Sequence, residues 1–261
     1  MMPKDALLEA IRSLPTLLAA HVRLSVLALL AGLAISLPLA ILIARRPWSR
    51  SIVLTTIGVI QTIPGLALLA LMVPLLASLS LMVHRISGWE FSALGFTPAF
   101  LALMLYSMLP IVRNTVEALR GIDPDLLEAA SGLGMTSRQT LWRVELPLAS
   151  PLILAGVRTS AVWVVGTATL ATPVGQRCLG NAIFQGLQTR NWVSVVIACI
   201  AAAGLAVLLD RLFGWIEAAT RQRNLSSLGL ATSALVLVIA LGWFADAIPR
   251  FESGPNQAIV A

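Results

Sequence analysis

The sequence predicts an all-α integral membrane protein, a polytopic helical bundle of about six transmembrane helices. Of its 261 residues, 58% are hydrophobic and only 11% are charged, and the mean hydropathy is +0.89. A chain with so few charges cannot cover itself with a water-exposed surface, which places it in the membrane class. Its apolar residues form runs near the roughly 20 residues that a helix needs to cross a bilayer. These runs lie at 22–44, 52–76, 95–112, 148–172, 192–213 and 228–248.

The limits of the early runs differ in how well they are defined. The first, 22–44, begins late and is long enough to span, so no cleavable signal is expected before it. The second, 52–76, contains Pro64-Gly65 and is followed by further apolar residues. The third, 95–112, is short for a span, so the boundaries of these two are the least certain.

A polar stretch between the third and fourth runs, DPDLLEAASGLGMTSRQTLWRVELP, predicts a short helix. Asp123 is a good N-cap residue, and Pro124 suits the first helical turn, where its missing N–H leaves no bond unmade. Gly134 suits the left-handed residue that ends a helix. Ala129 and Ala130 are small enough to let another surface approach this helix closely.

A second short helix is expected after the glycine. Thr136 and Gln139 have the spacing of a capping box. The helix would carry apolar side chains, Trp142 among them, and Pro147 would stop it. Two short helices meeting at a glycine corner predict a rigid knob with an apolar tip, which suits a groove on a partner protein. The alternative is an ordinary amphipathic connector between membrane helices.

The spacing in this stretch resembles the EAA motif, the coupling loop of bacterial ABC-type importer permeases. In that motif three residues separate the second alanine from a glycine, and the stretch closes with an aliphatic residue, any residue, Leu and Pro. The matching residues are Glu128, Ala129, Ala130, Gly134, Leu146 and Pro147, the close being Val144-Glu145-Leu146-Pro147. The resemblance implies that residues 113–147 form a cytoplasmic loop between spans three and four that couples this chain to an ATPase.

Longer segments resemble the permeases for osmoprotectants such as glycine betaine, choline and carnitine. They are VIQTIPGLALLALMVPLL at 59–76 and the stretch from LYSMLP to TATLA at 105–171. The resemblance implies a permease domain over residues 20–213. Residues 1–19 would then be an extracytoplasmic segment, and residues 214–261 an accessory transmembrane helix and tail.

One segment departs from these relatives. Where they commonly show a Gly-rich run, this chain has ATPVGQRCLG at 171–180, in which Pro173 and Arg177 add stiffness and charge. Other small solutes, an amino acid or an alkylsulfonate, therefore stay as alternatives within the importer class. A secondary transporter working without ATP would need an ion-coupling site or inverted repeats, and a membrane enzyme would need a convergent catalytic set; neither pattern is evident.

Arginine placement predicts the orientation in the membrane. Ten arginines fall in three loops on one side and seven basic residues on the other, a modest bias, but the clusters all lie on the first side. Positive residues favour the cytoplasm, so we expect this side, with the coupling loop, to be cytoplasmic and both termini outside. The first set is Arg45, Arg46, Arg50, Arg113, Arg120, Arg138, Arg143, Arg211, Arg221 and Arg223, and the second is Lys4, Arg12, Arg23, Arg85, Arg177, Arg190 and Arg250.

Polar residues inside the spans are candidates for the translocation path. In the second span, Gln61 and Thr62 adjoin Pro64, and a proline there frees backbone carbonyls that can line a cavity. The alternative is a structural kink that neighbouring helices satisfy. Tyr106, the only tyrosine, and Thr167 in the fourth span are further candidates, although such residues commonly serve helix packing.

Arg158 lies within the fourth apolar run and therefore requires a partner or an exit to the headgroups. One hypothesis is structural, with the side chain reaching the cytoplasmic interface or bonding Glu145 and loop carbonyls. The other is an inner gate that repels cations. Asp210 and Arg211, near the end of the fifth span, suggest an interfacial charge pair.

The remaining chemistry points to separate partner chains. There is no Walker A pattern and no long soluble region, so the ATPase subunits, which would hold ATP and Mg²⁺, and an extracytoplasmic solute-binding protein must be separate. We therefore expect a transport subunit of the cytoplasmic (inner) membrane, not an enzyme, with no cofactor or metal of its own. It would pair in the lipid bilayer with a second copy or a sibling permease, and no basic run supports nucleic-acid binding.

The histidines and cysteines give no sign of a metal site. His21 and His84 lie near span ends and are expected to be solvated, with no second ligand nearby. Cys178 and Cys199 show neither a CxxC spacing nor histidine companions, so they suggest small apolar residues and no disulfide framework.

Overall fold

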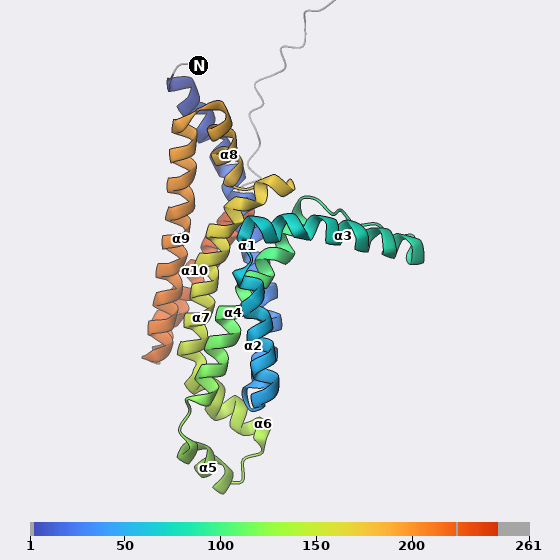
Figure 1. Ribbon diagram of the computed structural model, residues 1–261. Helices are drawn as coiled ribbons and strands as arrows, with labels where there is room; N and C mark the ends of the chain where they lie inside the picture. Colours follow the sequence, from blue (N-terminus) through green and yellow to red (C-terminus); the bar gives the residue numbers. More distant parts are fainter. Residues whose placement is uncertain (1–2, 223, 245–261) are drawn as a thin grey trace, which may run out of the picture.

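The computed structural model describes residues 3–222 and 224–244, and the regular structure in them is helical throughout (Figure 1). This agrees with the all-α class predicted from the sequence. The elements are α1 (Pro3–Ala44), α2 (Pro47–Thr62), α3 (Gly65–Ser87), α4 (Phe96–Arg120), α5 (Pro124–Gly132), α6 (Ser137–Thr140), a π-helical turn (Leu141–Glu145), α7 (Leu146–Ala168), a 3₁₀ segment (Thr169–Val174), α8 (Gly180–Thr189), α9 (Trp192–Arg221) and α10 (Leu225–Phe244).

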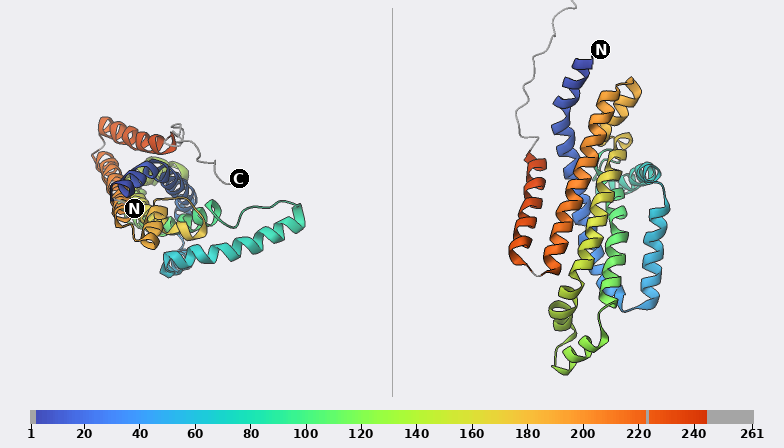
Figure 2. Two further views of the ribbon diagram at one scale, coloured as in Figure 1. Left: turned by 90° about the horizontal axis from the view of Figure 1, so that it is seen from above. Right: turned by 90° about the vertical axis from the view of Figure 1, so that its left-hand side faces the viewer.

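Four long helices, α1, α4, α7 and α9, form the body of the bundle and run along a shared direction (Figures 1 and 2). α1 packs against α4 and α7, and α7 also contacts α9. Leu24, Leu103 and Val164 are fully buried where the first three of these helices meet. The short helices α5 and α6 lie at one end of the bundle, and the N-terminus and α8 lie at the other (Figure 1).

Glycine allows α4 and α7 to approach each other closely. A Cβ placed on Gly156 of α7 would lie 2.8 Å from the Pro110 carbonyl oxygen and 2.9 Å from the Asn114 Cβ of α4. The nearby Ser160 hydroxyl donates a hydrogen bond to the Ser107 carbonyl at 2.7 Å. Small residues combined with hydroxyl bonds are the usual means by which membrane helices pack tightly.

The second predicted span, 52–76, is not one helix. α2 ends at Thr62 and α3 begins at Gly65, and α3 projects sideways from the bundle, across the direction of its long helices (Figures 1 and 2). Pro64 explains the break, because it has no N–H to continue the helix and it forces the preceding residue out of the helical conformation. Ile63 is accordingly extended, with φ −70° and ψ 126°.

The expectation that Pro147 ends the second loop helix was also wrong. α6 continues through the π-helical turn, in which the Leu146 N–H bonds to the Leu141 carbonyl, and on into α7. The wider turn immediately before Pro147 accommodates a residue that has no N–H to donate. The end of the loop and the fourth span are therefore one continuous helical segment.

Five helical segments in the described residues are long and apolar enough to cross a membrane, namely 11–44, 65–87, 96–120, 137–174 and 192–221. The third span is longer than predicted and includes the start of the expected loop. α3 qualifies by length and composition, although it runs across the others. The apolar part of α10, Ser226–Ala240, is shorter, and the predicted end of the sixth span at residue 248 lies outside the described residues. A total of six spans therefore stays a prediction.

The expectation of a solvated His21 was wrong. Its side chain is fully buried within the bundle, and Nε2 lies 3.0 Å from the Val165 carbonyl oxygen of α7. His84 is exposed, as expected, and its Nδ1 lies 3.4 Å from Glu90. His21 thus belongs to the α1–α7 interface and is not accessible to solvent.

We predict that Gly156→Ala destabilises the protein by about 1–3 kcal/mol, because the added methyl group overlaps the α4 backbone. This would lower the apparent melting temperature in detergent by about 2–4 °C for each kcal/mol. Gly166→Ala on the same helix is the control, since a Cβ there would meet no atom within 4 Å. Equal melting temperatures for the two variants would contradict the close packing of α4 and α7.

Candidate functional site

The loop at the end of the bundle far from the N-terminus begins with a capped helix (Figure 1). The Asp123 carboxylate accepts a hydrogen bond from the Asp125 N–H at 3.0 Å, and Pro124 occupies the first turn of α5. This confirms the N-cap predicted from the sequence. Because the cap satisfies a backbone donor that would otherwise lack a partner, α5 has a defined starting point.

Gly134 forms the corner that was predicted. Its φ of +74° lies in the left-handed region, and the Met135 N–H reaches back to the Ala130 carbonyl at 3.1 Å. Such a bond closes the end of a helix by satisfying one of its last carbonyls. The chain therefore leaves α5 in a fixed direction and not as a flexible tether.

The capping box that opens α6 is also present. The Thr136 hydroxyl accepts from the Gln139 N–H at 3.3 Å, and the Gln139 side chain accepts from the Thr136 N–H at 2.8 Å. Beyond it, Trp142 is exposed on the π-helical turn, as are Leu126 and Leu133 on and just after α5. The loop thus has rigid ends and several large apolar side chains that the rest of the chain leaves uncovered.

The base of this loop is fixed to the bundle by a buried charge. Glu145, in the π-helical turn, is 3% exposed, and its carboxylate forms an ion pair with Arg45 just after α1. Around it, Leu141 and Leu146 pack against a small apolar cluster that includes Ala44 and Leu119. The end of α1, the end of α4 and the start of α7 therefore meet directly beneath the loop.

The predicted coupling residues are divided between the surface and this base. Glu128 and Ala129 are exposed on α5, whereas Ala130 is buried. Gly134 lies at the corner between α5 and α6. Leu146 packs into the base, and Pro147 is exposed at the start of α7. The arrangement presents a rigid, partly apolar surface to a partner while its other end packs against three helices.

The predicted path residues gather around the break between α2 and α3. The Gln61 side chain donates to the Tyr106 carbonyl at 2.7 Å, and the Tyr106 hydroxyl donates to the Ile63 carbonyl. That carbonyl precedes Pro64, where the regular helix is interrupted. Tyr106 is 4% exposed, so its observed role is to support the break from inside the bundle.

Thr167 approaches the same break, and Thr62 does not. A Cβ placed on Gly65 would lie 3.2 Å from the Thr167 Cγ2 and 3.9 Å from the Tyr106 hydroxyl. The Thr62 hydroxyl instead bonds its own helix at the Val59 carbonyl, on an exposed face. Four of the five path candidates thus share one neighbourhood, and the contacts that they make support the interrupted helix.

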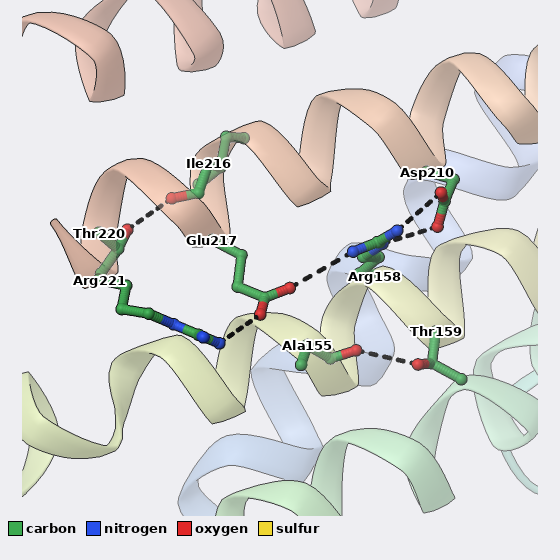
Figure 3. A network of polar contacts seen from close by, with 8 residues as sticks. All are labelled: Ala155, Arg158, Thr159, Asp210, Ile216, Glu217, Thr220 and Arg221. Carbon is green, nitrogen blue, oxygen red and sulfur yellow. Dashed lines mark hydrogen bonds and ion pairs between the residues drawn. The ribbon is translucent and has the colours of Figure 1, made fainter.

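Arg158 on α7 is paired with acidic residues of α9 (Figure 3). Its Nε and Nη2 donate to the two Asp210 carboxylate oxygens at 2.6 and 2.8 Å, and Nη1 lies 3.5 Å from Glu217. Gly214 makes room for this contact, since a Cβ there would lie 3.0 Å from Arg158 Nη1. A two-pronged bond of this kind is the strongest geometry available to an arginine and a carboxylate.

Two expectations about these charges require correction. Glu145, which had been considered as a partner for Arg158, is paired with Arg45. Asp210 pairs with Arg158 and not with the adjacent Arg211. A signal for the true partner existed in the sequence, because Asp210, Gly214 and Glu217 recur at helical spacing and define one face of the fifth span. The observed contacts favour the structural role of Arg158 over a gate.

Histidine, cysteine and acidic side chains do not cluster into a metal site anywhere in residues 3–222 and 224–244. Cys178 is fully buried, and its burial raises the pKa of the thiol. Cys199 is exposed on α9, and both cysteines are free.

Comparisons with known proteins match this geometry. The family described as the binding-protein-dependent transport system inner membrane component matches residues 36–222. The chain is similar to the choline transport system permease protein OpuBB of Bacillus subtilis, with 34% identity over 210 residues covering 80% of this chain and 87% of that protein. It is also similar to the osmoprotectant import permease protein OsmW of Salmonella typhimurium, with 38% identity over 190 residues covering 73% and 83%.

A solved structure shares the fold. The inward-facing MetNI methionine ABC transporter contains a chain that aligns with a TM-score of 0.66 at 21% identity, covering 78% of this chain and 94% of that one.

We predict that Arg158→Leu lowers stability by about 1–3 kcal/mol, because it leaves Asp210 without its main partner. This range lies below the about 3–5 kcal/mol of a fully buried pair, since the Arg158 and Asp210 side chains are 36% and 35% exposed. The double variant Arg158→Leu/Asp210→Leu should recover part of the lost melting temperature in detergent. Arg143→Leu, on the exposed loop, serves as the control. Additive losses in the double variant would show that the pair does not couple α7 to α9.

Proposed function

Because the chain belongs to the family of binding-protein-dependent transport system inner membrane components, we propose that it is the permease subunit of an ATP-binding-cassette importer for an osmoprotectant such as glycine betaine or choline. The observation that carries this proposal is the rigid loop built from α5, the Gly134 corner and α6. It presents exposed apolar side chains at one end of a membrane bundle while its base packs against three helices. A force applied to such a surface reaches the transmembrane helices with little loss.

The substrate class rests on the relatives. The curated proteins similar to this chain include permeases for choline, carnitine and osmoprotectants in general. Solutes of this group carry a fixed quaternary ammonium charge, which proteins usually hold with aromatic cages. Aromatic residues make up only 6% of this chain, so selectivity would reside in a separate binding protein. The path itself would use the uncharged groups around the α2–α3 break.

The partners follow from what a permease needs. A separate ATPase would bind ATP and Mg²⁺ and receive the loop, which we place in the cytoplasm because of the arginine clusters near it. A solute-binding protein would approach the opposite end. A second copy of this chain or a sibling permease would pack on α3, whose outer part leaves Leu75, Leu79 and Met82 uncovered.

Transport would proceed by alternating access. When two ATPase subunits close around ATP, they would draw the two loops together and shift the bundle from inward-open to outward-open, a rigid-body change of the kind known for domain closure. Solute delivered at the outer end would then enter a central path between two permease subunits. The runner-up solute is an amino acid, since the solved structures that share the fold include methionine and amino acid transporters.

Uptake of radiolabelled glycine betaine into proteoliposomes tests this function directly. The vesicles would hold this chain with its candidate ATPase, and the binding protein would be added outside, with or without ATP inside. Uptake that depends on both ATP and the binding protein is expected. ATP-dependent uptake of methionine without betaine uptake would keep the importer and discard the osmoprotectant. Betaine uptake that does not require ATP would point to a secondary transporter.

The coupling role of the loop predicts a sharp effect at Gly134. Gly134→Val should abolish ATP-dependent uptake while leaving membrane insertion intact, because a β-branched residue cannot adopt the left-handed conformation without strain. Gly134→Asn is the matched control, since asparagine tolerates that conformation, and it should retain most of the uptake. Both variants would be compared at equal amounts of inserted protein. Full uptake with Gly134→Val would rule out a fixed corner as part of the coupling.

A further inference from the structure

A large basic cavity lies at the end of the bundle opposite the coupling loop. Its volume is about 1600 Å³, and it is formed by the N-terminal half of α1, the segment before α8, α8 itself and the first turn of α9. Four arginines line it, Arg12, Arg23, Arg177 and Arg190. None of the described residues that line the cavity is acidic. This cavity has no part in the coupling loop or the α2–α3 break.

The charge of this cavity is not neutralised within the chain. Arg12, Arg177 and Arg190 are exposed, and none of the three forms an ion pair in the part of the chain that the structure describes. The amides of Gln185 and Asn191 add further polar groups to the wall. Guanidinium groups in a shared concave wall favour carboxylates, which they can bind with two parallel hydrogen bonds each.

The position of the cavity places it outside the membrane. α1 contains 42 residues. At about 1.5 Å per residue it is about 63 Å long, roughly twice the thickness of the hydrocarbon core of about 30 Å. With the Arg45 end of α1 at one membrane surface, its first turns project beyond the other. Arg12 therefore faces water at the end that the proposed orientation makes extracytoplasmic.

The backbone holds one of these arginines in an unusual conformation. Arg190 has φ +56°, the only positive value at a non-glycine residue within the described chain, and it ends α8. The Asn191 N–H bonds to the Gly186 carbonyl at 2.8 Å, which closes the corner between α8 and α9. A strained backbone position that surrounding bonds maintain is a mark of functional sites.

The size and charge of the cavity argue against the solute as its ligand. Pockets for small molecules usually measure about 300–1000 Å³, and this cavity is larger. Glycine betaine and choline also carry a fixed positive charge, which a wall of arginines repels. A protruding, acidic part of another protein satisfies both the volume and the charge.

We propose that this cavity is the docking site for an acidic protrusion of the solute-binding protein, with Arg177 and Arg190 as principal contacts. The inference rests on the proposed function and adds the chemistry of the contact. Arg177 comes from the segment at 171–180 in which the sequence departs from its relatives, so this chain builds part of the surface from residues of its own. Attraction between opposite charges would speed docking and weaken with salt.

The first test measures the affinity of the purified binding protein for the reconstituted complex in nanodiscs. The double variant Arg177→Glu/Arg190→Glu should weaken binding at least tenfold, and raising the salt concentration should weaken binding to the unaltered complex. Arg85→Glu, exposed at the end of α3 and outside the cavity, is the charge-matched control and should bind normally. Equal affinity of the double variant and the control would overturn the proposal. So would a loss seen only in nanodiscs that contain phosphatidylglycerol, because the cavity would then hold a lipid headgroup.

A second test takes advantage of Lys4, the only lysine in the chain. In a Lys4→Arg background with a blocked N-terminus, Arg190→Lys adds a single amine and keeps the positive charge. A carbodiimide would join this amine to a partner carboxylate as an amide, releasing the corresponding urea, and mass spectrometry would identify the acidic residue. Arg85→Lys in the same background should give no cross-link. Cross-linking from that position alone would overturn the proposal.

The two layers of the hypothesis fail in different ways. If no binding protein stimulates ATP hydrolysis by the unaltered complex, the proposed function fails and this inference with it. If stimulation is normal and persists in the Arg177→Glu/Arg190→Glu variant, only the docking site is wrong.

Discussion

A helix inside a lipid bilayer has no water to satisfy its polar groups, and each irregular feature of this chain is met by a compensating contact. The break before Pro64 exposes the Ile63 carbonyl, which the Tyr106 hydroxyl satisfies. The guanidinium of Arg158 within the fourth span lies against Asp210 and Glu217. The bundle therefore tolerates a broken helix and a charged span because helices far apart in sequence supply the missing partners.

The coupling loop follows a different rule, because it obtains its order locally. Its caps, its glycine corner and its capping box all form between residues a few positions apart. A surface that must transmit force to a membrane domain benefits from this, since its shape does not depend on what the spans are doing. The long-range contacts begin only at its base, where Glu145 meets Arg45.

The same distinction explains what could be predicted from the sequence. The Asp123 cap, the Gly134 turn and the Thr136–Gln139 box were predictable because each depends on residue type and short spacing. The partner of Arg158 lies 52 residues away and the group that supports Ile63 lies 43 residues away, and a single sequence gives no measure of such pairings. The Pro147 error has another cause: a proline was read as a helix end, but a π-helical turn absorbed it. The basic cavity was missed because its arginines come from separate elements.

The length of α1 has a mechanical consequence. One continuous helix extends from the basic cavity, through the Arg12 and Arg23 walls, to the residue that is bonded to the base of the coupling loop. A displacement at either end is carried along a single backbone, with no loop in between to absorb it. The two faces of the membrane are in this sense the two ends of one lever, so tilting α1 would move the cavity and the loop base together.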